Sequence, residues 1–338
     1  MLERRGLRVA AGGALAALLS SSPPAFAHGE SERETPVRTT TDGPAPGGEE
    51  AIDDGETHFT AGLDVVVGFG KTPSVDQAPP VSANVTPMNL VESDPVQTDS
   101  FVFDFAYAPT KNRDFRVRLP VTTGAIDPDA YQARTLSAIG NVELEGKLAF
   151  RLSSELAVLA SLSIAFPTSQ GSAVPSTAAA LPTSFDPNAY DRYSLNYAAA
   201  ASRGFEDDEL FFSGRFGLVP KVALEYRPVS GVRLDSYAKL ENLICTAEND
   251  GAGYVGELVL AADASYRVNR YFEPGVRLWT TLELAGSTGA SVGVVEPEIR
   301  FWVGNFTPYL GVILPFAGAL AKDPSRFVGV RLGASLAF

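Results

Sequence analysis

A two-residue alternation of apolar and polar side chains runs through most of this 338-residue chain. It is clearest at 141–152, NVELEGKLAFRL, where Val142, Leu144, Leu148 and Phe150 fall on one parity and charged residues fall on the other. Successive side chains of a β-strand point to opposite faces, so the pattern predicts a strand with one apolar face. A helix would not sort the residues in this way.

Similar runs recur along the chain, which gives about twelve predicted strands in total, an even number. The others lie near 59–70, 99–109, 113–122, 154–167, 209–227, 231–246, 253–268, 271–285, 289–303, 305–317 and 326–338. Short joints such as PTKNRD and YRVNRY alternate with longer connections at 71–98, 123–134, 168–208, 246–252 and 318–325, and only 286–288 breaks the alternation. Short turns at one end and long loops at the other are typical of a transmembrane, antiparallel, up-and-down β-barrel with both termini on the periplasmic side.

The apolar parity has no charged residue in the centres of the strands, as a lipid-facing surface requires. Its aromatic residues gather near the short joints and termini, which predicts a girdle at one membrane interface. The girdle comprises Phe59, Tyr107, Phe115, Phe150, Tyr226, Tyr266, Phe272, Phe306 and Phe338, and Phe69, Phe166, Phe212 and Phe316 form a sparser second belt. A soluble β-sandwich is the alternative, but its core would scatter these aromatics along the strands.

Prolines conflict with a closed barrel, because such a barrel has no edge at which a missing N–H is harmless. We expect bulges or strand ends at Pro220, Pro274, Pro297, Pro308 and Pro315.

The opposite parity is densely charged and is expected to face a polar lumen. The predicted pore-lining residues are Glu143, Glu145, Lys147, Arg215, Lys221, Glu225, Arg233, Asp235, Lys239, Glu257, Asp263, Arg277, Glu296, Glu298 and Arg300.

The N-terminal region indicates export. Residues 1–27 combine an arginine-rich start, a short apolar run and an Ala-Phe-Ala cleavage site, which is typical of a signal peptide. Residues 28–57 are acidic and rich in Pro and Gly, which predicts a disordered linker before a barrel at 58–338. The net charge of −13 disfavours nucleic acid as a partner, and the single Cys245 excludes a disulfide.

The last eight residues, RLGASLAF, carry a second signal. Arg331, Gly333, Leu336 and Phe338 occupy a polar position, a glycine position, a hydrophobic position and the terminal aromatic position. This arrangement resembles the C-terminal assembly signal of Gram-negative outer-membrane β-barrel proteins of the porin-like type. The resemblance implies a location in the cell outer membrane, with outer-membrane lipids and the assembly machinery as partners. It identifies no subfamily.

Three functions remain open on the sequence. The first is a channel for passive diffusion of small hydrophilic solutes, and the second is a plugged structural or adhesive scaffold whose charges pair across the lumen. An outer-membrane lipid hydrolase is disfavoured, because the only histidines, His28 and His58, belong to no Ser/His motif. We therefore expect no enzymatic activity, no cofactor and no metal. The 168–208 connection could fold into the pore or remain outside as a loop.

Acidic residues of the long connections allow a separate reading. They could bind calcium at the external surface or form a solvated acidic face. These residues are Glu92, Asp94, Asp127, Asp129, Asp186, Asp191, Glu206, Asp207 and Asp208.

Overall fold

The structure is a computed structural model that describes residues 58–75, 91–110, 112–126, 134–169, 171, 187–228, 231–246, 253–286, 291–321 and 327–338. The predicted signal peptide and linker lie outside these ranges. The strands are β1 (His58–Val75), β2 (Val91–Thr110), β3 (Arg113–Ile126), β4 (Arg134–Ile139), β5 (Val142–Arg151), β6 (Leu156–Phe166), β7 (Arg215–Tyr226), β8 (Val232–Cys245), β9 (Tyr254–Tyr266), β10 (Phe272–Ala285), β11 (Val292–Phe301), β12 (Phe306–Gly318) and β13 (Val328–Ala337).

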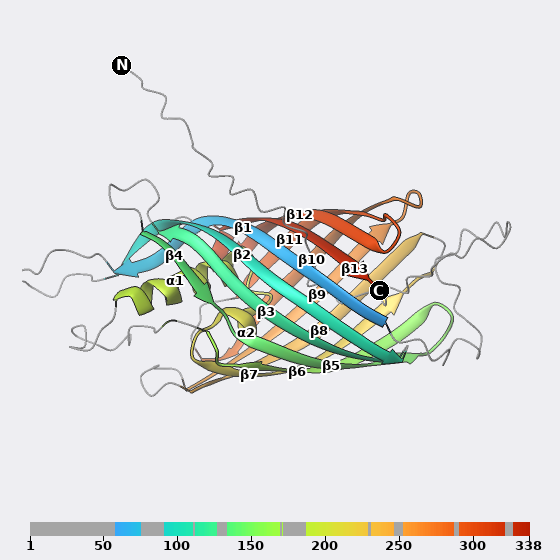
Figure 1. Ribbon diagram of the computed structural model, residues 1–338, viewed down its shortest axis with the longest axis horizontal. Helices are drawn as coiled ribbons and strands as arrows, with labels where there is room; N and C mark the ends of the chain where they lie inside the picture. Colours follow the sequence, from blue (N-terminus) through green and yellow to red (C-terminus); the bar gives the residue numbers. More distant parts are fainter. Residues whose placement is uncertain are drawn as a thin grey trace, which may run out of the picture.

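The strands form one closed antiparallel barrel (Figure 1). Apart from β4 and β5, each strand pairs with its neighbours in sequence, and β1 pairs with β13 to close the wall. Because β4 and β5 both pair with β3, they act as two parts of one wall strand, and the barrel is twelve-stranded. This confirms the predicted fold class. Among the described residues, no helix is both long and apolar enough to cross a membrane.

The interruption between β4 and β5 lies opposite Pro120 in β3. Gly140 donates its N–H to the Pro120 carbonyl at 3.0 Å, and regular pairing resumes beyond the break. Pro120 itself has no N–H to return to the ladder. The wall strand therefore has one extra residue at this break, as in a β-bulge, and Asn141 contacts Leu210 of α2 there.

Prolines elsewhere in the wall disturb the pairing locally. The β11–β12 register shifts between Gly293 and Val294, and Val294 is paired with Pro315. Pro220 in β7 and Pro297 in β11 each sit where pairing to one neighbouring strand is interrupted. The expected irregularities are present, and the barrel accommodates them without opening an edge.

The two faces of the wall differ as the alternation predicts. Large apolar side chains are exposed on the outer face, including Phe115, Leu144 and Val222, whereas their charged neighbours point inward and are buried. The aromatics predicted near the short turns are all on the outer face, and all are exposed except Phe272, which is half-buried beside Phe301. One residue of the second belt was wrong: Phe212 is buried inside the barrel.

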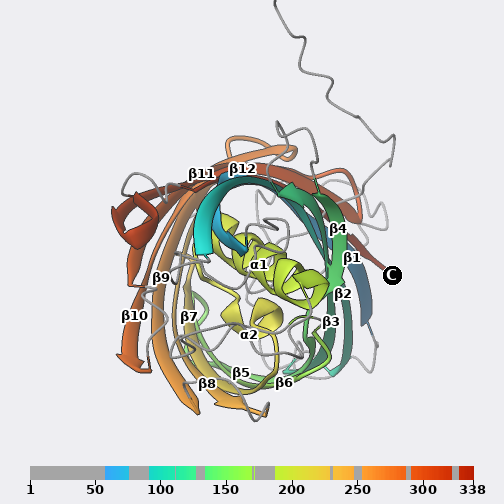
Figure 2. The ribbon, with the colours of Figure 1, turned by 90° about the vertical axis from the view of Figure 1, so that its left-hand side faces the viewer.

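The interior contains two helices, α1 (Pro187–Ser202) and α2 (Asp208–Phe211). Figure 2 looks into the barrel from one end and shows both helices inside it. The strand predicted at 209–227 therefore begins only at Arg215, because its first residues form α2 and a turn. A 3-10 helix, η2 (Ala319–Ala321), follows β12. We call residues 187–213 the plug segment.

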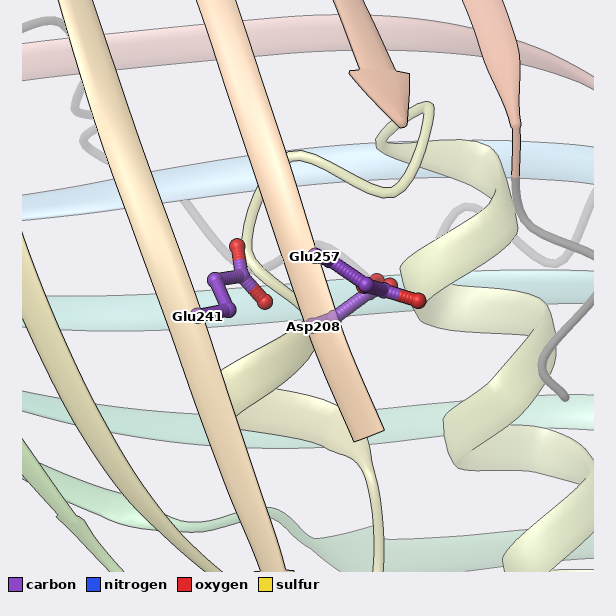
Figure 3. A group of neighbouring side chains, drawn as sticks. All are labelled: Asp208, Glu241 and Glu257. Atoms are coloured by element: carbon purple, nitrogen blue, oxygen red, sulfur yellow. The ribbon is translucent and has the colours of Figure 1, made fainter. Parts of the chain in front are cut away.

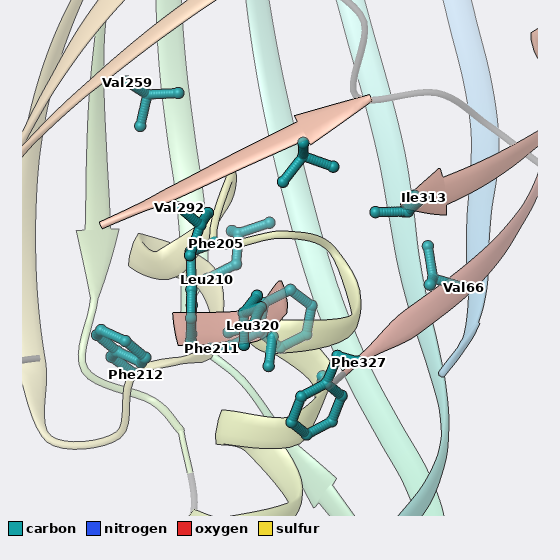
Figure 4. Close-up of a cluster of buried hydrophobic side chains, with 14 of the residues drawn as sticks. Val66, Phe205, Leu210, Phe211, Phe212, Val259, Val292, Ile313, Leu320 and Phe327 are labelled. Atoms are coloured by element: carbon teal, nitrogen blue, oxygen red, sulfur yellow. The ribbon is translucent and has the colours of Figure 1, made fainter. Parts of the chain in front are cut away.

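An apolar cluster joins the plug segment to the wall (Figure 4). Phe205, Leu210 and Phe211 contribute from the plug segment and are fully buried. From the wall and the β12–β13 connection come Val66, Val259, Val292, Val294, Ile313, Leu320 and Phe327. The barrel thus has a packed hydrophobic core inside a wall whose outer surface is also apolar.

An arginine on the outer face tests which medium that face contacts. Leu144 of β5 is 45% exposed and lies six residues before the girdle residue Phe150, well away from the rim. We expect Leu144→Arg to cost about 2–4 kcal/mol of unfolding free energy in lipid bilayers, the cost of a cation near the bilayer midplane. Urea unfolding in vesicles measures it, with Leu144→Met as the matched control. An equal stability of both variants would contradict a lipid-facing wall.

Candidate functional site

The plug segment turns sharply where α1 ends. Gly204 adopts a φ of +69°, and its N–H binds the Ala201 carbonyl while the N–H of Phe205 binds the Ala200 carbonyl. This is the Schellman arrangement, in which a glycine takes the left-handed position after the last helical residue. The turn directs the next residues, RGFEDDELFF, across the lumen.

Glycines in the wall allow α1 to approach the strands closely. Gly68 of β1 and Gly329 of β13 are paired in register, and both face the end of α1. A Cβ at Gly68 would overlap the Ser202 side chain, and a Cβ at Gly329 would overlap the Ser202 carbonyl oxygen. Because these two glycines have no side chains, the end of α1 can lie directly against the strands. Larger residues at either position would prevent this contact.

The first ionic contact of the plug segment is made by Arg203, which is fully buried. Its guanidinium contacts the Asp64 carboxylate at 2.5 Å and donates to the Ser100 hydroxyl at 3.0 Å. Asp64 also accepts a hydrogen bond from the Tyr309 hydroxyl at 2.9 Å. The end of α1 is therefore fixed to β1, β2 and β12 at once.

Glu206 contacts strands β8, β10 and β13 of the wall, and Asp207 contacts strand β3. Glu206 forms an ion pair with Arg277 of β10, accepts a hydrogen bond from Tyr237 at 2.5 Å, and lies 3.5 Å from Arg331. Asp207 lies 2.9 Å from the guanidinium of Arg118 in β3. These contacts span the lumen from one side to the other.

Glu209 lies between two wall cations, at 3.0 Å from Arg118 and 3.1 Å from Lys239. Arg118 also contacts Glu143 at 2.5 Å. One arginine of the wall therefore holds two carboxylates of the plug segment and one carboxylate of its neighbouring strand.

Asn141, at the break between β4 and β5, binds the backbone of α2. Its side-chain amide donates to the carbonyls of Glu209 at 2.9 Å and Phe212 at 2.8 Å, and its backbone N–H donates to Leu210 at 2.6 Å. These bonds satisfy carbonyls at the end of a short helix that has no helical partners for them. The break in the wall strand thus places donors beside the carbonyls of the plug segment.

Burial alone would raise the pKa values of Glu206 and Asp207, but the arginines of the wall hold both below their ordinary range. Asp208 differs from these neighbours. Burial, followed by nearby carboxylates, raises its pKa well above the ordinary range.

Other charges of the wall pair with one another. The wall pairs are Asp114 with Lys147 at 2.6 Å, Asp104 with Arg116 at 3.3 Å, Asp263 with Arg300 at 2.9 Å, Glu296 with Arg331 at 3.0 Å, and Arg233 with Asp235.

Toward the short turns, a small cavity of about 20 Å³ lies between the plug segment and the wall. It is lined by side chains that include Arg116, Glu145, Lys221 and Asp207.

All fifteen residues predicted to line a pore lie on the inner face of the wall. Twelve are buried, and Glu145, Lys221 and Asp263 are half-buried. Whether they line a conducting path stays a prediction. Of the predicted assembly signal, Arg331 is buried among the ion pairs inside the barrel. Its part in assembly stays a prediction.

The sequence left open whether the 168–208 connection folds into the pore, and the structure places residues 187–208 of it inside the barrel. Asp191, Glu206, Asp207 and Asp208 were assigned to the external surface, but the structure buries all four inside the barrel. A run of four acidic residues between buried aromatics, FEDDELFF, was the available signal. Asp64, Arg118 and Asn141, which hold the plug segment, were not singled out as site residues either.

No family model matches this chain, and no curated protein matches it. Among solved structures, an outer-membrane channel from Pseudomonas putida F1 is similar at a TM-score of 0.50 and 10% identity, covering 85% of this chain and 98% of the other. The NanC porin is similar at 0.47 and 9%, covering 81% and 98%. The KdgM porin is similar at 0.43 and 9%, covering 82% and 99%.

At this level of identity the similarity concerns the fold. The chain has the fold of an outer-membrane β-barrel protein, as its terminal residues suggested, and no subfamily is identified. His58 begins β1 at the rim and is half-buried, whereas His28 lies outside the described residues.

The contact between α2 and the wall can be tested with two glycines of the same wall strand. A Cβ at Gly140 would overlap the Leu210 carbonyl oxygen, whereas a Cβ at Gly146 meets nothing within 4 Å. We expect Gly140→Ala to destabilise the closed position of the plug segment by about 1–3 kcal/mol, the usual cost of overpacking. This raises the equilibrium constant for its opening by about 5- to 150-fold. Gly146→Ala should leave it unchanged.

The measurement is the rate at which a thiol reagent labels a cysteine placed at the buried Ala200, in a background in which Cys245 is replaced by Ser. Equal labelling rates in the Gly140→Ala and Gly146→Ala variants would contradict the contact between α2 and the wall.

Proposed function

We propose that this protein is an outer-membrane channel for small hydrophilic solutes, and that the plug segment controls passage through its lumen. The observation that carries the proposal is the half-buried, charged inner wall between the short-turn rim and the plug segment. Glu145, Lys221 and Asp263 remain partly accessible there, and the small polar cavity beside Asp207 continues the same surface. A charged, hydrated inner surface is what a pathway for polar solutes requires.

The plug segment closes this pathway in the conformation described. Its contacts are ion pairs and hydrogen bonds with side chains, together with one apolar cluster on the long-loop side. The cavity beside Asp207, of about 20 Å³, holds little more than one water. We therefore propose that a larger solute passes this point only when the contacts of the plug segment rearrange.

The charge balance of the interior favours cations. Among the described residues, 15 carboxylates and 10 cationic side chains are buried. A lumen with excess negative charge lowers the energy of a cation relative to an anion. We therefore propose that any conductance is weakly cation-selective.

The same proposal includes the outer membrane as location, its lipids as the surrounding medium, and the assembly machinery as the partner of the C-terminal strand. The apolar exposed face and the terminal Phe338 support these points. No catalytic role is proposed.

A second candidate is a permanently plugged scaffold. The observation that favours it is the complete burial of Phe205, Leu210 and Phe211 in the interior cluster. Such burial gives the closed state a large apolar contribution, about 25 cal/mol per Å² of area removed from water.

Planar-bilayer recording separates the two candidates. We expect the wild type to show discrete openings, and replacement of residues 187–213 by a flexible Gly/Ser linker to give a permanently open, larger conductance. Arg203→Met should raise the open probability, because it removes the buried cation that fixes the end of α1 to Asp64.

Arg151→Met is the matched control, because Arg151 is an exposed arginine at the end of β5, away from the plug segment. A silent wild type with a conducting linker variant would identify the scaffold. Silence of both would refute the channel.

A further inference from the structure

Three buried carboxylates meet at the boundary between the plug segment and the wall. Asp208 begins α2, whereas Glu241 and Glu257 belong to β8 and β9, and all three are fully buried (Figure 3). One carboxylate oxygen from each residue lies within 4.8 Å of the corresponding oxygens of the other two.

The register of the wall makes this arrangement costly without a counter-charge. Glu241 is directly opposite Glu257, and Glu257 is directly opposite Glu283 of β10. Like charges directly opposite each other on neighbouring strands are destabilising. Three adjacent strands therefore present a row of carboxylates at one level of the lumen, and Asp208 is added to it from the plug segment.

Both carboxylate oxygens of Asp208 are buried and accept no hydrogen bond from an N–H group or a hydroxyl of the described residues. The group close enough to share a hydrogen bond with Asp208 is another carboxyl, that of Glu257. Lys239 contacts Glu241 at 2.7 Å, but it also contacts Glu209 at 3.1 Å and donates to the Glu206 carbonyl, so it is shared among several acceptors. A buried carboxylate without a compensating group is unstable, so a cation or a proton is needed there.

We propose that Asp208, Glu241 and Glu257 form a calcium-binding site that fastens the plug segment to the wall. Carboxylate oxygens are the ligands of hard divalent cations, and Ca²⁺ accepts six to eight of them at about 2.3–2.6 Å in flexible geometry. Oxygens within 4.8 Å of one another fit around one such ion, since opposite ligands of Ca²⁺ lie about 4.6–5.2 Å apart.

Calcium suits this site better than magnesium. Mg²⁺ demands near-ideal octahedral geometry and sheds its waters reluctantly, so an enclosed site made of carboxylates disfavours it. Glu283 is only half-buried and lies near the long-loop end of β10, so the row of carboxylates extends toward that rim. Because Asp208 moves with the plug segment and the two glutamates belong to the wall, the bound ion links the two parts.

The test uses the full chain, folded in detergent, freed of metal with a chelator and titrated with CaCl₂ in a calorimeter, with MgCl₂ in parallel. We expect a saturable Ca²⁺ site, weaker Mg²⁺ binding, and a higher thermal unfolding midpoint with Ca²⁺. Asp208→Asn and Glu257→Gln should each weaken Ca²⁺ binding by at least about tenfold. Even the loss of a residue that only hydrogen-bonds to a metal ligand weakens metal binding by about tenfold or more. Both variants should also lose the thermal shift.

Neither substitution should prevent folding, because each removes a buried charge from a like-charged row. The gel mobility of unheated protein, which differs from that of boiled protein for closed barrels, checks this. Glu155→Gln is the matched control, because Glu155 is exposed at a short turn far along the chain from the site, and it should bind Ca²⁺ as the wild type does.

Two results would overturn the site. Unchanged Ca²⁺ affinity in Asp208→Asn would place the ion elsewhere, for example on external acidic residues. The second result is a thermal unfolding midpoint that does not change with Ca²⁺ but rises at lower pH. It would mean that protons shared among the carboxylates compensate their charge instead of calcium. Neither result bears on conductance, so the channel proposal is tested separately.

Discussion

The width of a twelve-stranded barrel is the constraint on which the interior depends. With strands about 4.8 Å apart and tilted by about 40°, the backbone radius is near ~12 Å, too wide for the wall's own side chains to fill. A helix with its side chains is about 10–12 Å across. The plug segment supplies the missing volume, and the glycine pair Gly68 and Gly329 lets α1 lie against the wall.

Apolar and ionic contacts contribute differently to this interior. The cluster around Phe205, Leu210 and Phe211 removes apolar area from water, which favours the closed state wherever the helices lie. Buried ion pairs add little net stability because desolvation offsets their attraction, yet an unpaired buried charge is costly. The pairs of Arg203 with Asp64 and of Glu206 with Arg277 therefore select one position of the plug segment among many apolar alternatives.

The wall was predictable from the sequence because its periodicity is local: Leu144 outside and Glu143 inside follow from strand geometry alone. The plug segment was not, because nothing local distinguishes a long external loop from one folded inward. The acidic run at 206–209 suggested solvent, and only its tertiary partners Arg118, Lys239 and Arg277 explain its burial. Phe212 was misplaced for the same reason, since it sits beyond the end of the alternating run.

The proposed calcium site and the proposed channel are linked by thermodynamics. An ion bound by both Asp208 and the wall is lost, or bound more weakly, when the plug segment leaves its seat. A ligand that prefers the closed state lowers the open population by its differential affinity, so calcium at about 100 times its dissociation constant can suppress opening up to roughly 100-fold. Reciprocity requires that any change that opens the plug segment also weakens calcium binding. When calcium is scarce, repulsion between Asp208 and the row formed by Glu241, Glu257 and Glu283 favours opening, whereas a bound calcium ion would remove this repulsion and act against permeation.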